Sequence, residues 1–426
     1  MRRGAYWAPA GRSIVDLAGF PSGAIPAGRG SFTAAMDLEL GPRYEELRRE
    51  VREFLAARRD DAPSSAVGAE VPMERRLAWQ RTLVEAGFVG RTVPVEYGGH
   101  GAAPDLVEGI VIEQEFAAAR VSLGMQNQGI GMLVPTLLRF GSEQQKRELI
   151  GPTLRGELIW CQGYSEPGSG SDLASLSTRG ELRGDRWIVN GLKIWTSTAR
   201  QADRMFALVR TEPDAGKHAG ISYLLIDMSS PGIEVRPLVT MTGDASFNEV
   251  FFTDVEVPVT NVVGRPGQGW EVGTTTLRHE RALLGRPHQS EELFASAVAI
   301  VRRNGLLDEP VWRDRLIALE ARLVAMKANG LRALTAQLEG RDPGLSRLII
   351  KLEGCQLNYD VCGLALDALR ERGLSRPGGE HEEVGAWQYQ RMYALGLIIG
   401  GGSAQIQKNI IAESGLGMPR EPKVAT

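Results

Sequence analysis

The sequence contains few of the residues that cross-link small folds or hold metal ions. Only three of its 426 residues are cysteines, and none of them forms a Cys-x-x-Cys pair. An odd number of scattered cysteines favours free thiols in a reducing cytoplasm over a disulfide framework. The five histidines never occur as His-x-x-x-His, so the sequence predicts neither a structural nor a catalytic metal.

A strong net charge and long apolar runs are also missing. The 49 basic and 52 acidic residues leave a net charge of −3, so no overall field attracts nucleic acid or an anionic membrane. No apolar run approaches the roughly 20 residues that a membrane helix requires. With 43% hydrophobic residues the chain can bury a substantial core, as expected for two or three domains. We expect a soluble cytoplasmic protein with no membrane span and no nucleic-acid partner.

The first 36 residues differ in composition from the rest of the chain. They are rich in Gly, Ala, Pro and Arg, and Arg2-Arg3 resembles the start of a twin-arginine export signal. Pro9 and Arg12 interrupt any apolar stretch that such a signal would need. We interpret residues 1–36 as a disordered N-terminal extension, or as the product of a start codon assigned too early, with Met36 beginning the folded protein.

Changes in residue pattern divide the remaining chain into three zones. Helical periodicity dominates residues 37–155, and short β-rich runs without helices between them fill residues 156–265. Long amphipathic segments follow in residues 266–426. The predicted class is α+β, with an N-terminal all-helical domain, a central small antiparallel β-barrel or sandwich, and a C-terminal four-helix bundle.

The predicted bundle depends on a stripe of apolar residues that are four and three positions apart. This spacing is typical of a helix packed in a bundle. The stripe consists of Trp312, Leu316, Leu319, Leu323 and Met326. Such a stripe is core far more often than a cofactor site, and we interpret it as core.

The central zone contains the segment Trp187-Ile-Val-Asn-Gly-Leu-Lys-Ile-Trp195. Asn-Gly suits the positive backbone dihedrals of a type I′ turn, so the segment predicts a tight hairpin centred on Asn190 and Gly191. Further β-rich runs are Met205–Val209, Ile221–Ile226 and Val250–Val257.

The densest chemical signal is a run of glycine and serine, Gln162-Gly-Tyr-Ser-Glu-Pro-Gly-Ser-Gly-Ser-Asp172. Its glycines let a ligand approach the backbone, and the hydroxyls of Ser165, Ser169 and Ser171 supply hydrogen-bond donors. The run is not a dinucleotide fingerprint, because no Gly-x-Gly-x-x-Gly opens a helix after a strand, and it is not a Walker loop. By composition alone, such a run is more often a turn than a binding loop.

This run resembles the signature of acyl-CoA dehydrogenases, and the resemblance continues along the chain. Tyr164–Asp172, Trp187–Ser197, Phe247–Pro258 and Gly402–Gln407 follow in the family's order and spacing, over roughly residues 36–420. The resemblance implies an FAD enzyme that desaturates an acyl-CoA thioester to a trans-2-enoyl-CoA. It also implies an electron-transferring flavoprotein as electron acceptor. The acyl group stays open between aromatic, branched, fatty and steroid side-chain thioesters.

The resemblance also implies which residues meet the ligands. Its cofactor-binding residues are Gln162, Tyr164, Ser165, Gly170, Ser171, Trp195, Ser197, Ser403 and Gln405. Ser171 and Arg281 would contact the CoA part of the substrate, and the amide of Gly401 would bond the thioester oxygen, ahead of a helix capped by Ser403. Without the family, Trp195 is more simply an ordinary tryptophan in the core of a strand.

The base for the α-proton departs from the commonest family pattern. Many members carry it as a glutamate in a Tyr-Glu-Gly-Thr loop, where this sequence has Gly400-Gly-Gly-Ser403 and therefore Gly401 at the carboxylate position. A second family solution places the glutamate on an early helix of the C-terminal domain, where this chain has Glu280 followed by Arg281.

Glu280 lies on a helical stripe that is otherwise apolar, with Leu277 and Leu284 on the same face. Desolvation there would raise the pKa of the carboxyl and suit it to accept a proton near neutral pH. A structural ion pair with an arginine, or a solvated face, is the simpler alternative for such a residue. Together with the resemblance, the pattern predicts Glu280 as the catalytic base.

Two further departures concern assembly. The segments that hold the ADP half of a neighbour's FAD in typical members correspond here to Arg302–Leu306 and Arg372–Gly378, which lack the usual residues. Both a homotetramer and a heterotetramer therefore stay open. So do two other functions: a non-catalytic partner subunit, and a flavin oxidase or monooxygenase on the same fold.

Overall fold

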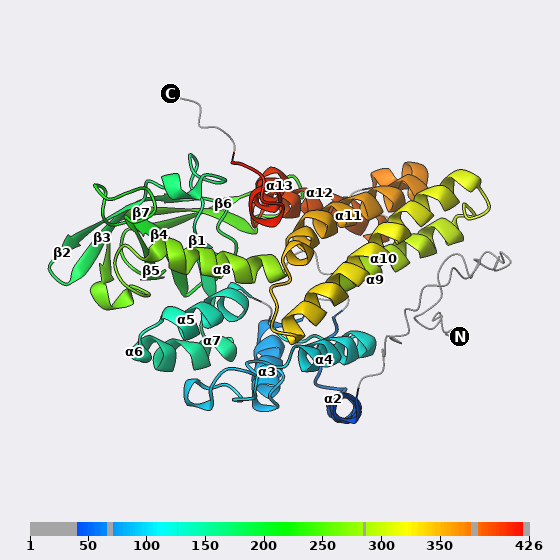
Figure 1. The fold of residues 1–426 in the computed structure, drawn as a ribbon, viewed down its shortest axis with the longest axis horizontal. Coiled ribbons are helices and arrows are strands. Elements are labelled where there is room, and N and C mark those ends of the chain that lie inside the picture. Colours follow the sequence, from blue (N-terminus) through cyan, green and yellow to red (C-terminus); the bar gives the residue numbers. More distant parts are fainter. Residues whose placement is uncertain (1–40, 66–70, 126, 284–286, 376–381, 421–426) are drawn as a thin grey trace.

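The computed structural model describes residues 41–65, 71–125, 127–283, 287–375 and 382–420. The predicted N-terminal extension lies outside the described residues. Figure 1 shows the N-terminal helices below a curled sheet and the long C-terminal helices beside it, with helix α8 crossing between these parts.

The N-terminal helices are short and interrupted by turns. Their bounds are α2 Pro42–Ala57, α3 Met73–Glu85, α4 Leu106–Ala119, α5 Val134–Phe140, α6 Glu143–Gln145 and α7 Gly151–Leu154. Leu47, Val51 and Leu55 are buried on one face of α2, as their spacing predicts. The buried Glu115 of α4 accepts hydrogen bonds from Arg48 and Arg52 of α2, at 2.8 and 2.7 Å, and thereby joins the two helices.

The central zone folds into one seven-stranded sheet. Its strands are β1 Trp160–Gly163, β2 Arg179–Arg183, β3 Arg186–Lys193, β4 Arg204–Arg210, β5 Ile221–Asp227, β6 Ile233–Leu238 and β7 Phe247–Pro258. The order is β1-β4-β2-β3-β7-β6, and β5 also pairs with β4. The three β-rich runs predicted after the hairpin lie in β4, β5 and β7 and are confirmed.

The predicted topology of this zone is wrong in two respects. Both β1 and β2 pair with β4 in parallel, so the sheet is mixed and not antiparallel. Its pairing path does not close, so the sheet is a curled half-barrel and not a closed barrel. Parallel pairing needs a long crossover, and the Gly/Ser-rich loop between β1 and β2 is part of that connection.

The predicted hairpin at Asn190 and Gly191 is also wrong. Both residues lie inside the continuous strand β3, which turns back to β2 through Gly184 instead, with a φ of +62°. The register of β3 against β7 shifts between Val189 and Gly191, which marks a β-bulge. The Asn190 side chain exchanges two hydrogen bonds of 2.9 Å with Asp254 on β7, so long-range pairing decides the conformation of Asn-Gly here.

In the described residues after the sheet, the structure contains six α-helices. They are α8 Gly269–Leu283, α9 Pro287–Arg303, α10 Pro310–Leu338, α11 Leu345–Leu369, α12 Glu382–Ile399 and α13 Ala404–Ile410. The predicted stripe on α10 is confirmed as core, with its last four residues buried and Trp312 packed at the edge. Helix α11 packs against α9, α10 and α12.

Helix α8 differs from the other long C-terminal helices in its neighbours. It packs against β4, β5 and α5, and therefore connects the sheet to the N-terminal helices. The amphipathic segment near residues 270–303 contains helices α8 and α9, on either side of residues 284–286, which lie outside the described residues. This division places the predicted base, Glu280, on a helix that faces the sheet.

The three cysteines, Cys161, Cys355 and Cys362, are buried free thiols, as predicted. Within the described ranges, no helix combines the length and the apolar character needed to cross a membrane.

Candidate active site

The two segments predicted to bind flavin meet just beyond the ends of strands β1 and β3. The amide of Ile194 donates to the carbonyl of Ser165 at 2.9 Å, although β1 and β3 are not neighbours in the sheet. The Ser165 loop and the Trp195 segment therefore lie side by side. The family resemblance implies their relation to a flavin but not this direct contact.

A buried ion pair fixes this junction. Lys193, at the end of β3, donates to Glu166 at 2.8 Å and to the carbonyl of Tyr164 at 3.2 Å, and both charged side chains are almost fully buried. Glu166 also accepts from the amides of Ser177 and Thr178, so its two oxygens join three segments of the chain. The sequence analysis missed this pair. Its signal was present, since Lys193 is the one charged residue of the second quoted motif, and Glu166 is one of two acidic residues in the first.

The pair shifts the pKa values of both groups. Burial alone would raise the pKa of Glu166, but the charge of Lys193 and the hydrogen bonds to the carboxylate lower it to about 2. Burial lowers the pKa of Lys193 to about 8, against the opposing effect of Glu166. Both groups are therefore charged near neutral pH, and the pair is a rigid ionic link between the two segments.

The side chain of Trp195 is exposed to solvent at this junction. Its side chain is 57% exposed, and its backbone has a φ of +60°, which is uncommon for a residue other than glycine. The ring of Phe247 meets the indole edge-on at a centroid distance of 6.0 Å. The interpretation of Trp195 as a strand-core residue is therefore wrong, and the indole is available for stacking.

The neighbouring hydroxyls are also available. Ser165 and Ser197 are half-buried, and neither hydroxyl bonds to another residue in the described part of the chain. Ser169 is different, because its buried hydroxyl donates to the carbonyl of Asp172 at 2.8 Å and so closes the loop on itself. The prediction that Ser169 supplies a donor to a ligand is wrong for this reason.

The other predicted residues of this loop occupy two environments. The ring of Tyr164 is buried and packs edge-on against Phe206 and Tyr223, so only its backbone can face a ligand. Burial raises the pKa of the Tyr164 phenol well above its ordinary value. Gly170 and Ser171 lie exposed on the loop surface, open to a ligand.

Glu280 and Gln162 approach each other from different elements. The Gln162 amide on β1 donates to Oε2 of Glu280 on α8 at 3.4 Å, and Glu280 is half-buried. One turn earlier on α8, the buried Thr276 hydroxyl lies 2.9 Å from that of Thr136, which holds the helix against the N-terminal helices. Arg281 follows on α8, but its side chain lies outside the described residues.

The glycine turn before α13 is built by the C-terminal helices. Gly401 and Gly402 have φ values of +64° and +98°, and the buried Lys351 on α11 donates to the carbonyl of Gly402 at 2.7 Å. Ser403 caps α13 by accepting from the amide of Ile406, as predicted, while Gln405 is exposed. The Lys351 contact is a second feature that sequence analysis missed.

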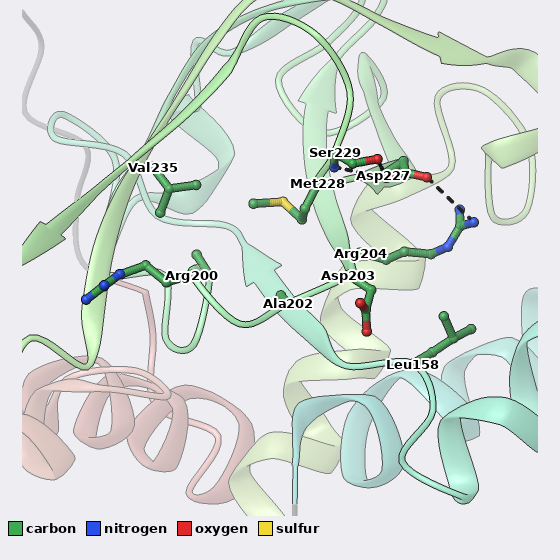
Figure 2. Close-up of a pocket in the computed structure, with 10 residues that line it drawn as sticks. Leu158, Arg200, Ala202, Asp203, Arg204, Asp227, Met228, Ser229 and Val235 are labelled. Atoms are coloured by element: carbon green, nitrogen blue, oxygen red, sulfur yellow. Dashed lines mark hydrogen bonds and ion pairs between the residues drawn. The ribbon is translucent and has the colours of Figure 1, made fainter. Parts of the chain in front are cut away.

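An open pocket of about 580 Å³ lies elsewhere on the sheet (Figure 2). Its floor includes the ion pair of Arg204 with Asp227, at 3.8 Å. None of the predicted site residues lines it.

Sequence profiles of one family match the chain in three consecutive parts. The acyl-CoA dehydrogenase N-terminal domain matches residues 42–157, the middle domain residues 161–255, and the C-terminal domain residues 267–416. The chain belongs to the acyl-CoA dehydrogenase family.

Individual relatives support the same membership. Acyl-CoA dehydrogenase IpdE1 of Mycobacterium tuberculosis (strain ATCC 25618 / H37Rv) is 39% identical over 391 residues, which cover 89% of this chain and 99% of that protein. A solved structure described as Tcur3481-Tcur3483 steroid ACAD aligns with a TM-score of 0.76 at 31% identity. The ChsE4-ChsE5 complex from Mycobacterium tuberculosis aligns with a TM-score of 0.75 at 29% identity. Both alignments cover 91% of this chain and all of the other.

As an acyl-CoA dehydrogenase, the chain is a flavin-dependent oxidoreductase, and the junction suits such a cofactor. A flavin needs a flat aromatic surface for its ring system and hydrogen-bond donors for its edge. The exposed indole of Trp195 and the hydroxyls of Ser165 and Ser197 provide both, on a base held rigid by the ion pair beneath. The donor set therefore fits a flavin.

Proposed function

We propose that this acyl-CoA dehydrogenase uses FAD to convert an acyl-CoA thioester into its trans-2-enoyl-CoA, with Glu280 as the base. The contact between Gln162 and Glu280 carries the proposal. It sets a carboxylate of α8 beside the strand that leads directly into the Ser165 loop. A base at this place supplies the carboxylate that Gly401 lacks.

The desaturation removes a proton from the α-carbon and a hydride from the β-carbon of the thioester. Bound FAD supplies the hydride acceptor at its N5 position. Glu280 accepts the α-proton on its carboxylate, which the Gln162 amide orients through Oε2. The Gly401 amide donates to the thioester oxygen and stabilises the negative charge that develops there as the proton leaves.

The residues that would hold the FAD come from three parts of the chain. Trp195 and Ser197 would cover one side of the ring system, while Gln162, Ser165 and the backbone of Tyr164 would bond its edge. The exposed Gly170 and Ser171 would meet the pyrophosphate. Ser403 and Gln405 would reach an FAD across a subunit boundary, which agrees with the exposed position of Gln405.

The substrate is held at its CoA end by Ser171 and Arg281. We propose a steroid-derived acyl-CoA as the substrate class, because a relative at 31% identity is described as a steroid ACAD. We propose an electron-transferring flavoprotein as the electron acceptor and the cytoplasm as the location, where the three buried thiols stay reduced.

For the assembly, we propose that α9 to α12 form the four-helix bundle of the family and that the chain is part of a homotetramer or heterotetramer. The complex of ChsE4 with ChsE5 supports a mixed assembly.

Anaerobic flavin bleaching tests the proposed reaction. The purified protein is mixed with a panel of acyl-CoA thioesters, and the fall in flavin absorbance gives the rate of reduction. Glu280→Gln should lower this rate by about 10² to 10⁴-fold without changing the flavin content. Glu271→Gln, an exposed substitution on the same helix, should keep the wild-type rate. A Glu280→Gln protein that is reduced as fast as wild type excludes Glu280 as the base.

A non-catalytic partner subunit is the second candidate function. The glycine at position 401 and the altered segments Arg302–Leu306 and Arg372–Gly378 favour it. In that case the chain purified alone is colourless and gains flavin only when co-produced with a second family member. A yellow, substrate-reducible protein purified alone excludes this candidate.

A further inference from the structure

The buried ammonium of Lys193 lies behind the peptide group that leads into Ser165. It donates to the carbonyl of Tyr164 at 3.2 Å, and this carbonyl and the amide of Ser165 belong to the same peptide group. The described residues contain no cis peptide bond, so the carbonyl and the amide point in opposite directions. The N–H of Ser165 is therefore directed away from Lys193.

The amide of Ser165 has no acceptor within the described part of the chain. Ser165 is half-buried, and its neighbours Tyr164 and Glu166 are buried. Backbone amides in such surroundings are normally paired with protein, water or a ligand. The Ser165 amide is therefore a donor available to the flavin that fits this junction.

The ion pair of Lys193 with Glu166 directs its positive end toward this peptide group. The carboxylate of Glu166 also accepts from the amides of Ser177 and Thr178, at 2.6 and 2.9 Å, whereas the ammonium of Lys193 contacts the Tyr164 carbonyl. The side chain of Lys193 is 0% exposed and that of Glu166 is 4% exposed. Solvent therefore screens the field of the pair only weakly.

We propose that Lys193 is a positioning residue that raises the reduction potential of the bound flavin through the peptide group of Tyr164 and Ser165. Hydrogen bonds in a chain polarise one another, so a cation on the carbonyl makes the amide of the same peptide group a stronger donor. A hydride that adds to a neutral flavin leaves a negatively charged ring, which a preorganised donor stabilises. The ammonium of Lys193 therefore favours the reduced flavin over the oxidised flavin.

This inference rests on the flavin site of the proposed function, but not on Glu280 or on the acyl group. Trp195→Ala tests that site separately, because it removes the stacking surface and should raise the dissociation constant of the flavin about tenfold. Unchanged flavin binding in Trp195→Ala would contradict the placement of the flavin, and with it the proposed function.

The main experiment measures the midpoint potential of the purified holoprotein, by anaerobic reduction with dithionite in the presence of a reference dye and without acyl-CoA. Lys193→Met should lower the ratio of the affinities for reduced and oxidised flavin about tenfold, which is a fall of about 30 mV for a two-electron couple. A purely structural role of Lys193 would weaken the binding of both redox states equally and leave the potential unchanged.

Lys217→Met is the matched control. Lys217 also pairs with an acid of the Gly/Ser-rich loop, Asp172 at 2.7 Å, but both side chains are exposed, so solvent screens this charge. The affinity ratio of Lys217→Met should stay within about twofold of wild type.

A double variant keeps the test independent of the stability of Lys193→Met, which leaves the carboxylate of Glu166 buried without its counter-charge. Glu166→Gln with Lys193→Met removes both charges, and such neutral replacements of buried pairs are often well tolerated. The glutamine oxygen still accepts from the amides of Ser177 and Thr178. The double variant should bind the flavin with a midpoint potential about 30 mV below wild type.

Two results would overturn the proposal. One is a wild-type midpoint potential in the double variant with the flavin bound, and the other is a fall in Lys217→Met as large as that in Lys193→Met. Either result would leave the placement of the flavin intact, since Trp195→Ala tests it independently.

Discussion

Glu166 and Lys193 show how single residues hold the candidate site together. Each is buried, and each lies in one of the two segments that would bind the flavin. Burying two charges is costly, and the cost is offset only when the pair and its further hydrogen bonds are complete. Here the carboxylate accepts four donors from Lys193, Ser177 and Thr178. The buried pair therefore links the segment of Ser165 to the segment of Trp195 and holds them at a fixed separation.

Glu166→Gln should lower the free energy of unfolding by about 3 to 5 kcal/mol at pH 7, because the ammonium of Lys193 is then buried without a counter-charge. The pKa of Glu166 is lowered from 4.5 to about 2 in the folded chain. Its stabilising contribution is therefore complete above about pH 4.5 and is lost as the pH falls toward 2. Urea unfolding between pH 2 and 7 should show the difference between wild type and Glu166→Gln shrinking across this interval.

Glu53→Gln serves as the control, since Glu53 is exposed on α2 and pairs only at the surface. It should change stability by less than about 0.5 kcal/mol. An equal loss of stability in Glu166→Gln and Glu53→Gln would contradict the structural role of the buried pair.

At the scale of the element, the glycine turn between α12 and α13 depends on a neighbouring helix. Lys351 on α11 donates to the carbonyls of Ile398 and Gly402, one on each side of the turn, at 3.0 and 2.7 Å. Gln407 on α13 donates to the carbonyl of Gly401 at 3.2 Å. Two glycines with positive φ would be mobile by themselves. These three bonds instead hold the Gly401 amide in one orientation, as a donor to a thioester oxygen requires.

Lys351→Met should release this turn while keeping the length of the side chain. Hydrogen exchange followed by mass spectrometry should show faster exchange at residues 400–403, because both carbonyl contacts of the ammonium are lost. The loss of stability should be about 1 to 3 kcal/mol, since the freed carbonyls lose charged donors.

Lys408→Met is the matched control, because Lys408 is exposed on α13 and its ammonium makes no hydrogen bond within the described residues. Exchange at residues 400–403 should then equal that of wild type. Unchanged protection in Lys351→Met would show that the glycine turn is held by other contacts.

At the scale of the whole molecule, helix α8 contacts three parts of the chain and holds them together. It packs on β4 and β5, contacts α5, and carries Glu280 toward Gln162 of β1. The approach is close at Gly273, where an added Cβ would lie 3.0 Å from Leu208 and 3.4 Å from the Tyr164 hydroxyl. The absence of a side chain at Gly273 therefore sets how near the predicted base comes to the sheet.

Gly273→Leu should push α8 away from the sheet and lower the free energy of unfolding by about 1 to 3 kcal/mol, the usual cost of overpacking. Flavin reduction by substrate should slow as well, because the Glu280 carboxylate is displaced from its place beside β1. Urea unfolding and anaerobic bleaching of the same preparation measure the two effects.

Gly109→Leu is the control for helix propensity. Gly109 lies in α4 with nothing within 4 Å of an added Cβ, so leucine there should be neutral or stabilise the helix by up to about 1 kcal/mol. If Gly273→Leu proved as stable as Gly109→Leu, close packing at Gly273 would not control the position of α8.

The local patterns of the sequence determined much of the fold. Apolar spacing predicted the buried face of α10, and β-rich runs predicted β4, β5 and β7, because these features depend on residues near one another in the chain. The resemblance of the motifs to those of the family likewise predicts that Glu280 and the Trp195 segment belong to one site, which stays a prediction. The side-chain chemistry and spacing needed for these predictions are complete in the sequence.

Only the tertiary structure decided features that depend on distant partners. Asn190-Gly191 became a bulge and not a turn, because Asp254 pairs with Asn190 across the sheet. Strand β1 paired in parallel with β4, and the charges of Glu166 and Lys193 became a buried link instead of separate surface groups. The spacing of residues in the sequence determines which face of a helix or strand a side chain occupies. Tertiary packing determines which residues that face contacts, because residues far apart in the chain can lie side by side in the fold.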